Sequence, residues 1–233
     1  MPRTKTKSAN TTETQTQREA RAKRIVEILH HHYGNAECEL TFKNPFQLLV
    51  ATILSAQCTD VRVNKVTPEL FKKFPTSESI TKSKPGEIEE IIKSTGFYNN
   101  KAKNIRGAAG IIVSKFNGEV PRTMDELLQL PGVARKTGNV VLSSAFGLTE
   151  GFVVDTHIQR LSRRLGFTKA DAPEKIEVDL CNLFPKTEWN FLSHAIIWHG
   201  RRICSARTPN CEHCPIAELC PSKNLAPDSW KKR

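Results

Sequence analysis

Four cysteines near the C-terminus have the spacing of a metal site. Cys204, Cys211, Cys214 and Cys220 follow the pattern C-x6-C-x2-C-x5-C. Four thiolates this close together suit either one tetrahedral soft-metal ion or an iron–sulfur cluster. Zinc ribbons usually bring two C-x2-C pairs, and this segment has one, so the spacing favours a cluster over zinc. The chain has seven cysteines, an odd number that argues against a disulfide framework.

A lysine and an aspartate have the side chains that imine chemistry requires. Lys136 follows Arg135 in L-P-G-V-A-R-K-T, residues 130–137, where a second helix is expected to begin. A helix start disfavours cations, and a nucleophilic amine must be neutral when it attacks. Arg135, the helix dipole and burial are therefore expected to keep Lys136 neutral and reactive. Asp155, in V-D-T-H-I, is placed to cap the next helix and to form an acid–amine pair with Lys136.

The same stretch predicts a binding site for phosphate. Pro131 and Gly132 make a tight turn between two helices, and the unpaired N–H groups there can hold a phosphate without reading sequence. The formal charge of +11 also favours a polyanionic partner, most often a nucleic acid.

The elements that must position these residues are all predicted to be helices, which makes the fold class all-α. Asn44 and Pro45 carry a cap and a first-turn proline before an apolar run, which predicts a buried helix. No alternating strand pattern of useful length occurs, and no apolar stretch is long enough to span a bilayer. Further helices are expected over 18–33, 60–71, 85–94, 101–116, 123–130, 155–165, 173–183 and 187–199.

Taken together, these motifs resemble those of the endonuclease III family. The hairpin, V-D-T-H-I and cysteine motifs are joined by L-S-A-Q-C-T-D at 54–60 and G-F-Y-N-N-K-A at 96–102. The resemblance runs from about residue 18 to 221. It implies a bifunctional DNA glycosylase and abasic-site lyase that removes oxidised pyrimidines from duplex DNA and cuts 3′ to the abasic site.

The resemblance also implies a role for each matching residue. Lys136 would form the Schiff base and Asp155 would activate it, while the four cysteines would bind a [4Fe–4S] cluster. Gln57 would fill the hole left by the extruded nucleotide, and Phe97 stands where the family has a leucine wedge. The remaining predicted DNA contacts are Gly132, Ala134, Arg135 and His157. Ala134 replaces a second glycine, and would cost about 1 kcal/mol if that position needs a positive φ.

The implied architecture is two helical domains with a DNA-binding cleft between them. A six-helix barrel with the helix–hairpin–helix is expected over 38–150, and a cluster domain over 18–37 and 151–223. Residues 1–17 and 224–233 are expected to be tails, the first basic and disordered. The expected partner is damaged double-stranded DNA, without a membrane. The protein is expected to be monomeric, cytoplasmic, associated with the nucleoid and prokaryotic.

Three alternatives remain open on sequence alone. A monofunctional mismatch glycosylase of the same superfamily usually lacks a lysine at the position of Lys136. A non-catalytic, cluster-bearing DNA-binding module would need neither Lys136 nor Asp155. Zinc in place of the cluster is the third.

Overall fold

The computed structural model describes residues 13–223 and residue 225. In this part of the chain all regular secondary structure is helical and no strand occurs, which confirms the all-α prediction. Three short 3₁₀ turns accompany the α-helices, at Lys93–Thr95, Lys186–Glu188 and Ala217–Leu219. The α-helices are α1 Gln15–Tyr33, α2 Pro45–Leu54, α3 Asp60–Lys73, α4 Ser77–Thr81, α5 Glu87–Ile92, α6 Tyr98–Lys115, α7 Met124–Leu127, α8 Arg135–Phe146, α9 Thr156–Arg164, α10 Pro173–Leu183 and α11 Trp189–Arg202.

Helices α2 to α8 form one half of the molecule, here called the barrel half. Helix α2 begins as predicted, with Asn44 accepting the Gln47 N–H and Pro45 in the first turn. Its side chains are buried nearly all round, because α3, α6 and α8 pack against it. A single apolar cluster running from Leu40 to Val153 forms the core of this half.

Helices α1, α9, α10 and α11 form the other half, here called the terminal half, around a separate apolar core. Helix α1 begins at Gln15, three residues before the expected start, because Thr14 and Gln17 form a capping box. Arg21 donates hydrogen bonds to the carbonyls of Leu165 and Leu219, at 2.8 and 3.3 Å. The start of the described chain is thereby joined to its end. The disordered tail was predicted for residues 1–17; residues 15–17 instead belong to α1, and residues 1–12 lie outside the described residues.

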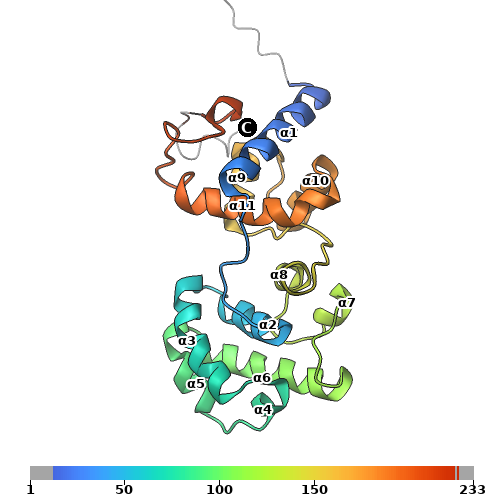
Figure 1. Ribbon diagram of the computed structural model, residues 1–233, viewed down its shortest axis with the longest axis vertical. Coiled ribbons are helices and arrows are strands. Elements are labelled where there is room, and N and C mark those ends of the chain that lie inside the picture. The colour runs from blue at the N-terminus through green and yellow to red at the C-terminus, as the bar shows by residue number, and fades with distance from the viewer. Residues whose placement is uncertain (1–12, 224, 226–233) are drawn as a thin grey trace, which may run out of the picture.

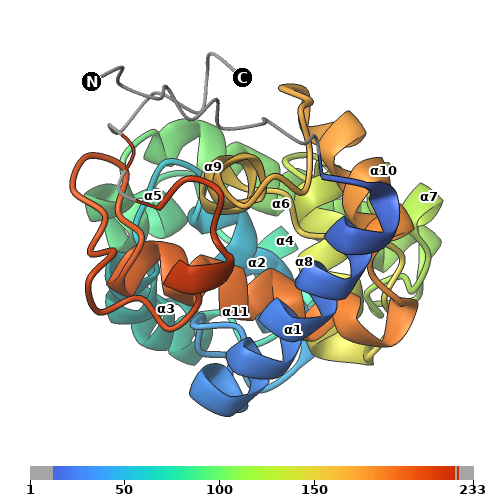
Figure 2. The same cartoon turned by 90° about the horizontal axis from the view of Figure 1, so that it is seen from above.

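The two halves lie one above the other and are joined by two chain segments (Figure 1). One segment leads from α1 to α2, and the other from α8 to α9. The second crosses between the cores, since Phe152 packs in the terminal half and Val153 in the barrel half. Figure 2 shows the same molecule from above, with α1 lying beside α11. No described helix combines the length and the apolar character that crossing a bilayer requires.

Candidate active site and cysteine cavity

The hairpin before α8 needs glycine at one position only. Gly132 has φ +80°, and a Cβ there would lie 2.9 Å from the Asn104 Cβ, so both backbone and space favour glycine. Ala134, the N-cap of α8, has φ −99° and is extended. The positive φ considered for this position is therefore absent, and alanine causes no backbone strain.

Lys136 is the second residue of α8, and its side chain is exposed. The burial expected from the sequence was wrong. Arg135 also differs from expectation, because its Nε and Nη2 donate to the Glu177 carboxylate at 2.9 and 3.2 Å. This hydrogen-bonded pairing raises the pKa of Arg135 and offsets its charge. Sequence analysis named three causes that would act on Lys136: burial, the charge of Arg135 and the helix dipole. The first is absent and the second is offset by Glu177, so only the helix dipole acts as expected.

Asp155 caps α9, as the sequence predicted. Its Oδ1 accepts the backbone N–H groups of His157 and Ile158 at 2.8 and 2.9 Å. Both bonds use Oδ1, and no described residue donates to Oδ2, so one carboxylate oxygen stays available. A cap of this kind also fixes the direction of the carboxylate.

Lys136 and Asp155 line the same cavity between the two halves, although 19 positions separate them in the chain. The apolar part of the wall includes Leu40, Val140, Val153 and Ile197. The charged or titratable side chains of the lining are Glu37, Cys38, Glu39, Asp60, Lys136, Asp155, His194 and Arg201. An amine and a carboxylate in one partly apolar cavity can carry out imine chemistry and proton transfer.

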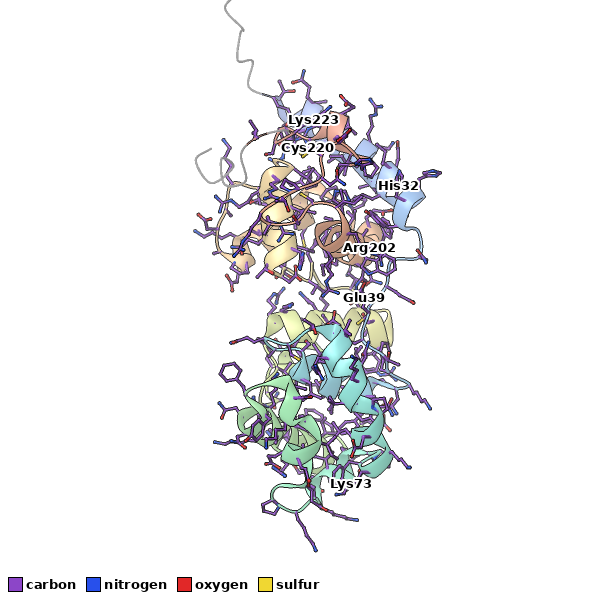
Figure 3. All side chains as sticks on the ribbon, turned by 90° about the vertical axis from the view of Figure 1, so that its left-hand side faces the viewer. His32, Glu39, Lys73, Arg202, Cys220 and Lys223 are labelled. Atoms are coloured by element: carbon purple, nitrogen blue, oxygen red, sulfur yellow. The ribbon has the colours of Figure 1, made fainter. Side chains whose placement is uncertain are left out.

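Ion pairs close one side of this cavity. Arg201 on α11 pairs with Glu39 in the connecting segment and with Asp60 at the start of α3. Arg202 lies within 3.6 Å of Glu39 and stacks on Trp198. Figure 3 shows Glu39 at the level between the two halves, below Arg202. Nearby, burial lowers the pKa of His194 to about 4, so this imidazole is neutral at pH 7.

Gln57 and Phe97 share an unusual backbone conformation. Their φ values are +52° and +48°, in the left-handed region that residues with a side chain seldom occupy. Gln57 is exposed between α2 and α3, and Phe97 is 65% exposed at the start of α6. Strain of this kind is often found at functional sites, and an exposed phenylalanine gains no stability from burial.

His157 lies apart from the cavity that holds Lys136 and Asp155. It is partly buried on α9, with Nδ1 3.2 Å from the Arg160 Nη2. A Cβ at Gly200 would come within 2.8 Å of the same ring nitrogen. Burial is the main cause that lowers the pKa of His157. Its predicted contact with DNA stays a prediction.

The structure brings the four predicted cysteines together around one cavity in the terminal half. Arg164 donates to the Cys204 Sγ at 3.2 Å, and the Cys214 Sγ lies 3.4 Å from the His199 Nε2. Leu161, Leu165 and Ile216 supply apolar wall. In the described residues no three possible ligands converge on a point that one metal ion could occupy. The four cysteines are thus placed where a metal centre with thiolate ligands can bind.

The pKa values of the thiols indicate the charge that a bound cluster must contribute. Burial, together with the neighbouring cysteines, raises the pKa of Cys214 to about 11, and burial raises the pKa of Cys220. Four thiolates in this cavity therefore need positive charge among them, which bound iron provides.

Several site residues gave no signal in the sequence. These residues depend on distant contacts or on burial. The contacts join segments 38 to 162 positions apart and involve Arg164, Glu177 and Arg201, while burial applies to His194. Nothing in their local sequence distinguishes them from surface or core residues. Only the folded chain shows where their partners are.

Comparisons with known proteins identify the family. The model of the HhH-GPD superfamily of base excision DNA repair proteins matches residues 50–186. The model of the iron–sulfur binding domain of endonuclease III matches residues 204–220. Endonuclease III of Synechocystis sp. is 57% identical over 202 residues, covering 87% of this chain and 92% of that protein. The chain belongs to the endonuclease III family.

Other members of the endonuclease III family agree in sequence and structure. Endonuclease III of Escherichia coli K12 is 40% identical over 85% of this chain and 94% of its own. A non-covalent endonuclease III–DNA complex is 44% identical with a TM-score of 0.84, covering 88% of this chain and 96% of that one. A trapped covalent endonuclease III–DNA intermediate, also 44% identical, has a TM-score of 0.83 with the same coverage.

Membership in the family establishes the general function. The chain is a base excision repair enzyme with DNA glycosylase and abasic-site lyase activity, and its partner is DNA. It carries a [4Fe–4S] cluster. The alternatives of a mismatch glycosylase and a non-catalytic module are not favoured.

Proposed function

We propose that Lys136 is the nucleophile that removes oxidised pyrimidines from duplex DNA. Its Nζ attacks the sugar C1′, the bond from C1′ to the base breaks, and the base leaves with the bonding electrons and a proton. The nitrogen lone pair then forms the C=N bond as the C1′–O4′ bond breaks and O4′ takes a proton from solvent, which gives a protonated imine between Lys136 and the sugar. The observation that carries this proposal is the shared cavity of Lys136 and Asp155.

The lyase step uses the same imine. Loss of a proton from C2′ sends electrons toward the imine carbon, and the C3′–O3′ bond breaks with departure of the 3′ phosphate. Asp155 moves protons and stabilises the positive charge that develops on the sugar. Its Oδ2 is suited to this role because Oδ1 is already held by two backbone N–H groups.

The damaged nucleotide must leave the helix before Lys136 can reach it, at a cost of a few kcal/mol. Phe97 inserts into the base stack as an apolar wedge, and Gln57 fills the space that the nucleotide vacates. Their exposure and left-handed backbones support these roles, since both side chains already project from the barrel half.

The hairpin holds the DNA backbone. The N–H groups of Gly132, Ala134 and Arg135 bind a phosphate at the start of α8, where the helix dipole favours an anion. The Val133 N–H instead donates to the Leu130 carbonyl at 3.1 Å. The side chain of Arg135 is half exposed beside its ion pair and adds positive charge at this surface. His157 contacts DNA from the terminal half.

The remaining proposals concern organisation. Cys204, Cys211, Cys214 and Cys220 are the cluster ligands, and the shared cavity supports this. The two apolar cores support domains at 38–150 and at 18–37 with 151–223. We also infer a monomer that acts on damaged double-stranded DNA without a membrane, in the prokaryotic cytoplasm near the nucleoid.

Borohydride trapping on a duplex with one oxidised pyrimidine tests the nucleophile, because reduction fixes the imine as a stable adduct. Lys136→Ala should abolish the adduct, while Lys175→Ala, an exposed lysine on α10, should leave it unchanged. An adduct of normal yield with Lys136→Ala would defeat the assignment. Base release without any adduct in the wild type would point to a monofunctional mechanism.

A further inference from the structure

Glu177 on α10 is a buried carboxylate with no part in the chemistry proposed above. The residue is 7% exposed, yet its side chain reaches out of α10 toward α8. It accepts two hydrogen bonds from Arg135, and its Oε1 accepts a third from the Asn139 Nδ2 at 3.2 Å. Both donors are on α8, on either side of Lys136 in the sequence.

The same carboxylate presses against the segment that leads to Asp155. A Cβ at Gly151 would lie 1.8 Å from the Glu177 Oε1, so only glycine lets the two approach. The Asn139 Nδ2 also donates to the Phe152 carbonyl at 3.1 Å. Glu177 and Asn139 therefore connect the helix of Lys136 to the segment that leads to Asp155.

This group of contacts also spans the two halves. Helix α10 is anchored in the terminal core by Ile176 and Leu180, which flank Glu177. Helix α8 is anchored in the barrel core by Val140 and Val141, which follow Asn139. A shift of one half against the other would have to break the hydrogen bonds of Glu177.

We propose that Glu177 is a positioning residue that holds Lys136 at the correct distance from Asp155. The inference rests on the proposed roles of these two residues. Glu177 holds the N-terminal part of α8 through Arg135 and Asn139, and it is linked to the Phe152 carbonyl through Asn139. A displacement of about 1 Å between reacting groups can cost about a hundredfold in rate, so a fixed distance matters for the rate.

The charge of Glu177 has a second effect, because it offsets Arg135 next to Lys136. Without this carboxylate, the positive charge of Arg135 beside Lys136 is no longer offset. The other charged or titratable groups that line the cavity are unchanged by substitution at Glu177; they are Glu37, Cys38, Glu39, Asp60, Asp155, His194 and Arg201.

The test measures imine formation under single-turnover conditions as a function of pH, by borohydride trapping with an excess of the full-length enzyme. Three variants are compared with the wild type. Glu177→Gln keeps the shape and removes the charge, while Glu177→Asp keeps the charge and shortens the reach. Glu174→Gln is the matched control, since it removes an exposed carboxylate from the same helix.

Glu177→Gln should lower the plateau rate roughly tenfold and move the acid limb roughly half a unit to lower pH. Glu177→Asp should lower the plateau but keep the midpoint of the wild type, and Glu174→Gln should match the wild type in both. The Kd for duplex DNA should change less than the rate does. Glu177→Asp carries the test of the plateau if Glu177→Gln does not fold.

Two results would overturn the inference. One is a wild-type plateau and midpoint in the Glu177 variants. The other is a loss of thermal stability alone, with trapped molecules that react at the wild-type rate and pH midpoint. A wild type that forms no adduct would instead refute the proposed role of Lys136, so the two failures are distinguishable.

Discussion

Arg201 and Asp60 form an ion pair across the two halves of the molecule, with 2.8 Å between the Arg201 Nη2 and the Asp60 Oδ2. Arg201 extends from α11, and Asp60 is the first residue of α3. Glu39, in the connecting segment, is the second acidic partner of Arg201. One guanidinium therefore ties together the terminal half, the barrel half and the connection between them.

Removal of this guanidinium should destabilise the protein more than removal of an ordinary surface charge. Arg201→Gln removes the ion pair of Asp60 and leaves Glu39 with only its longer contact to Arg202, which should cost about 2 kcal/mol and about 6 °C in Tm. The control is Lys73→Gln, which breaks the exposed pair with Glu87 inside the barrel half and should cost under about 0.5 kcal/mol. Thermal unfolding measures both, and equal shifts would show that the pair does not hold the halves together.

Two substitutions of Asp155 should separate its structural role from its chemical one. Asp155→Asn keeps an oxygen that can accept the His157 and Ile158 N–H groups, whereas Asp155→Ala loses the cap and about 1 kcal/mol of stability. Both should lower the single-turnover rate of base release at least a hundredfold. Denaturant unfolding combined with kinetics checks this. Near-normal rates for Asp155→Asn would exclude a need for the negative charge.

The hairpin should tolerate substitution at one of its two small residues and not at the other. Gly132→Ala introduces a Cβ at φ +80° that meets Asn104, so it should weaken binding to undamaged duplex DNA about tenfold or more. Ala134→Gly should leave the affinity within about twofold, because φ is negative there. Fluorescence anisotropy at fixed salt measures both affinities. A larger loss for Ala134→Gly would contradict the backbone assignment.

Stability should fall in mild acid because of His194. Burial lowers its pKa from the ordinary value of about 6.5 to about 4, so its contribution is present above pH 6.5 and is lost as pH falls toward 4. About 2 kcal/mol of unfolding free energy should disappear between pH 7 and pH 5 from this group. Urea unfolding at both pH values should show a smaller difference for His194→Leu. Exposed His31→Gln is the control, and an unchanged difference for His194→Leu would refute the assignment.

Each of the four cavity cysteines should be needed for a full cluster. The wild type should contain about four iron atoms and about four sulfides per chain. Cys214→Ser should lower both contents, whereas Cys181→Ser should not, because Cys181 lies in α10 away from that cavity. Metal and sulfide analysis decides the question, and stoichiometric zinc without sulfide would support the alternative reading of the cysteine spacing.

Local signals predicted much of the fold. The Asn44–Pro45 start of α2 and the full extent of α10 match the sequence expectation, because caps and apolar periodicity act over a few residues. Other starts were displaced: Thr59 and not Asp60 caps α3, and α6 begins at Tyr98 and not at Lys101. Helix α4 was missed, since five residues carry too little periodicity to be recognised.

Site residues that lie in sequence motifs could be predicted. Site features that depend on contacts between distant segments could not. Lys136, Asp155 and the four cysteines stand in recognisable patterns. The exposure of Lys136 and the pairing of Arg135 with Glu177 depend on α10, 42 positions beyond Arg135. The extended conformation of Ala134 could not be predicted either, because the φ angle at a hairpin residue is set by the folded hairpin and not by the local sequence.

The pairing of α1 with α11 has a consequence for the order of events during synthesis. Helix α1 ends at Tyr33, while α11 begins at Trp189, so the ribosome makes the whole barrel half between these two partners. At typical elongation rates of about 5–20 residues per second, roughly ten to thirty seconds pass between the synthesis of α1 and that of α11. The barrel core can close during that interval. The cluster can be enclosed only after Cys220 has emerged from the ribosome. Cluster loading therefore follows the synthesis of α1, of the barrel half and of α11.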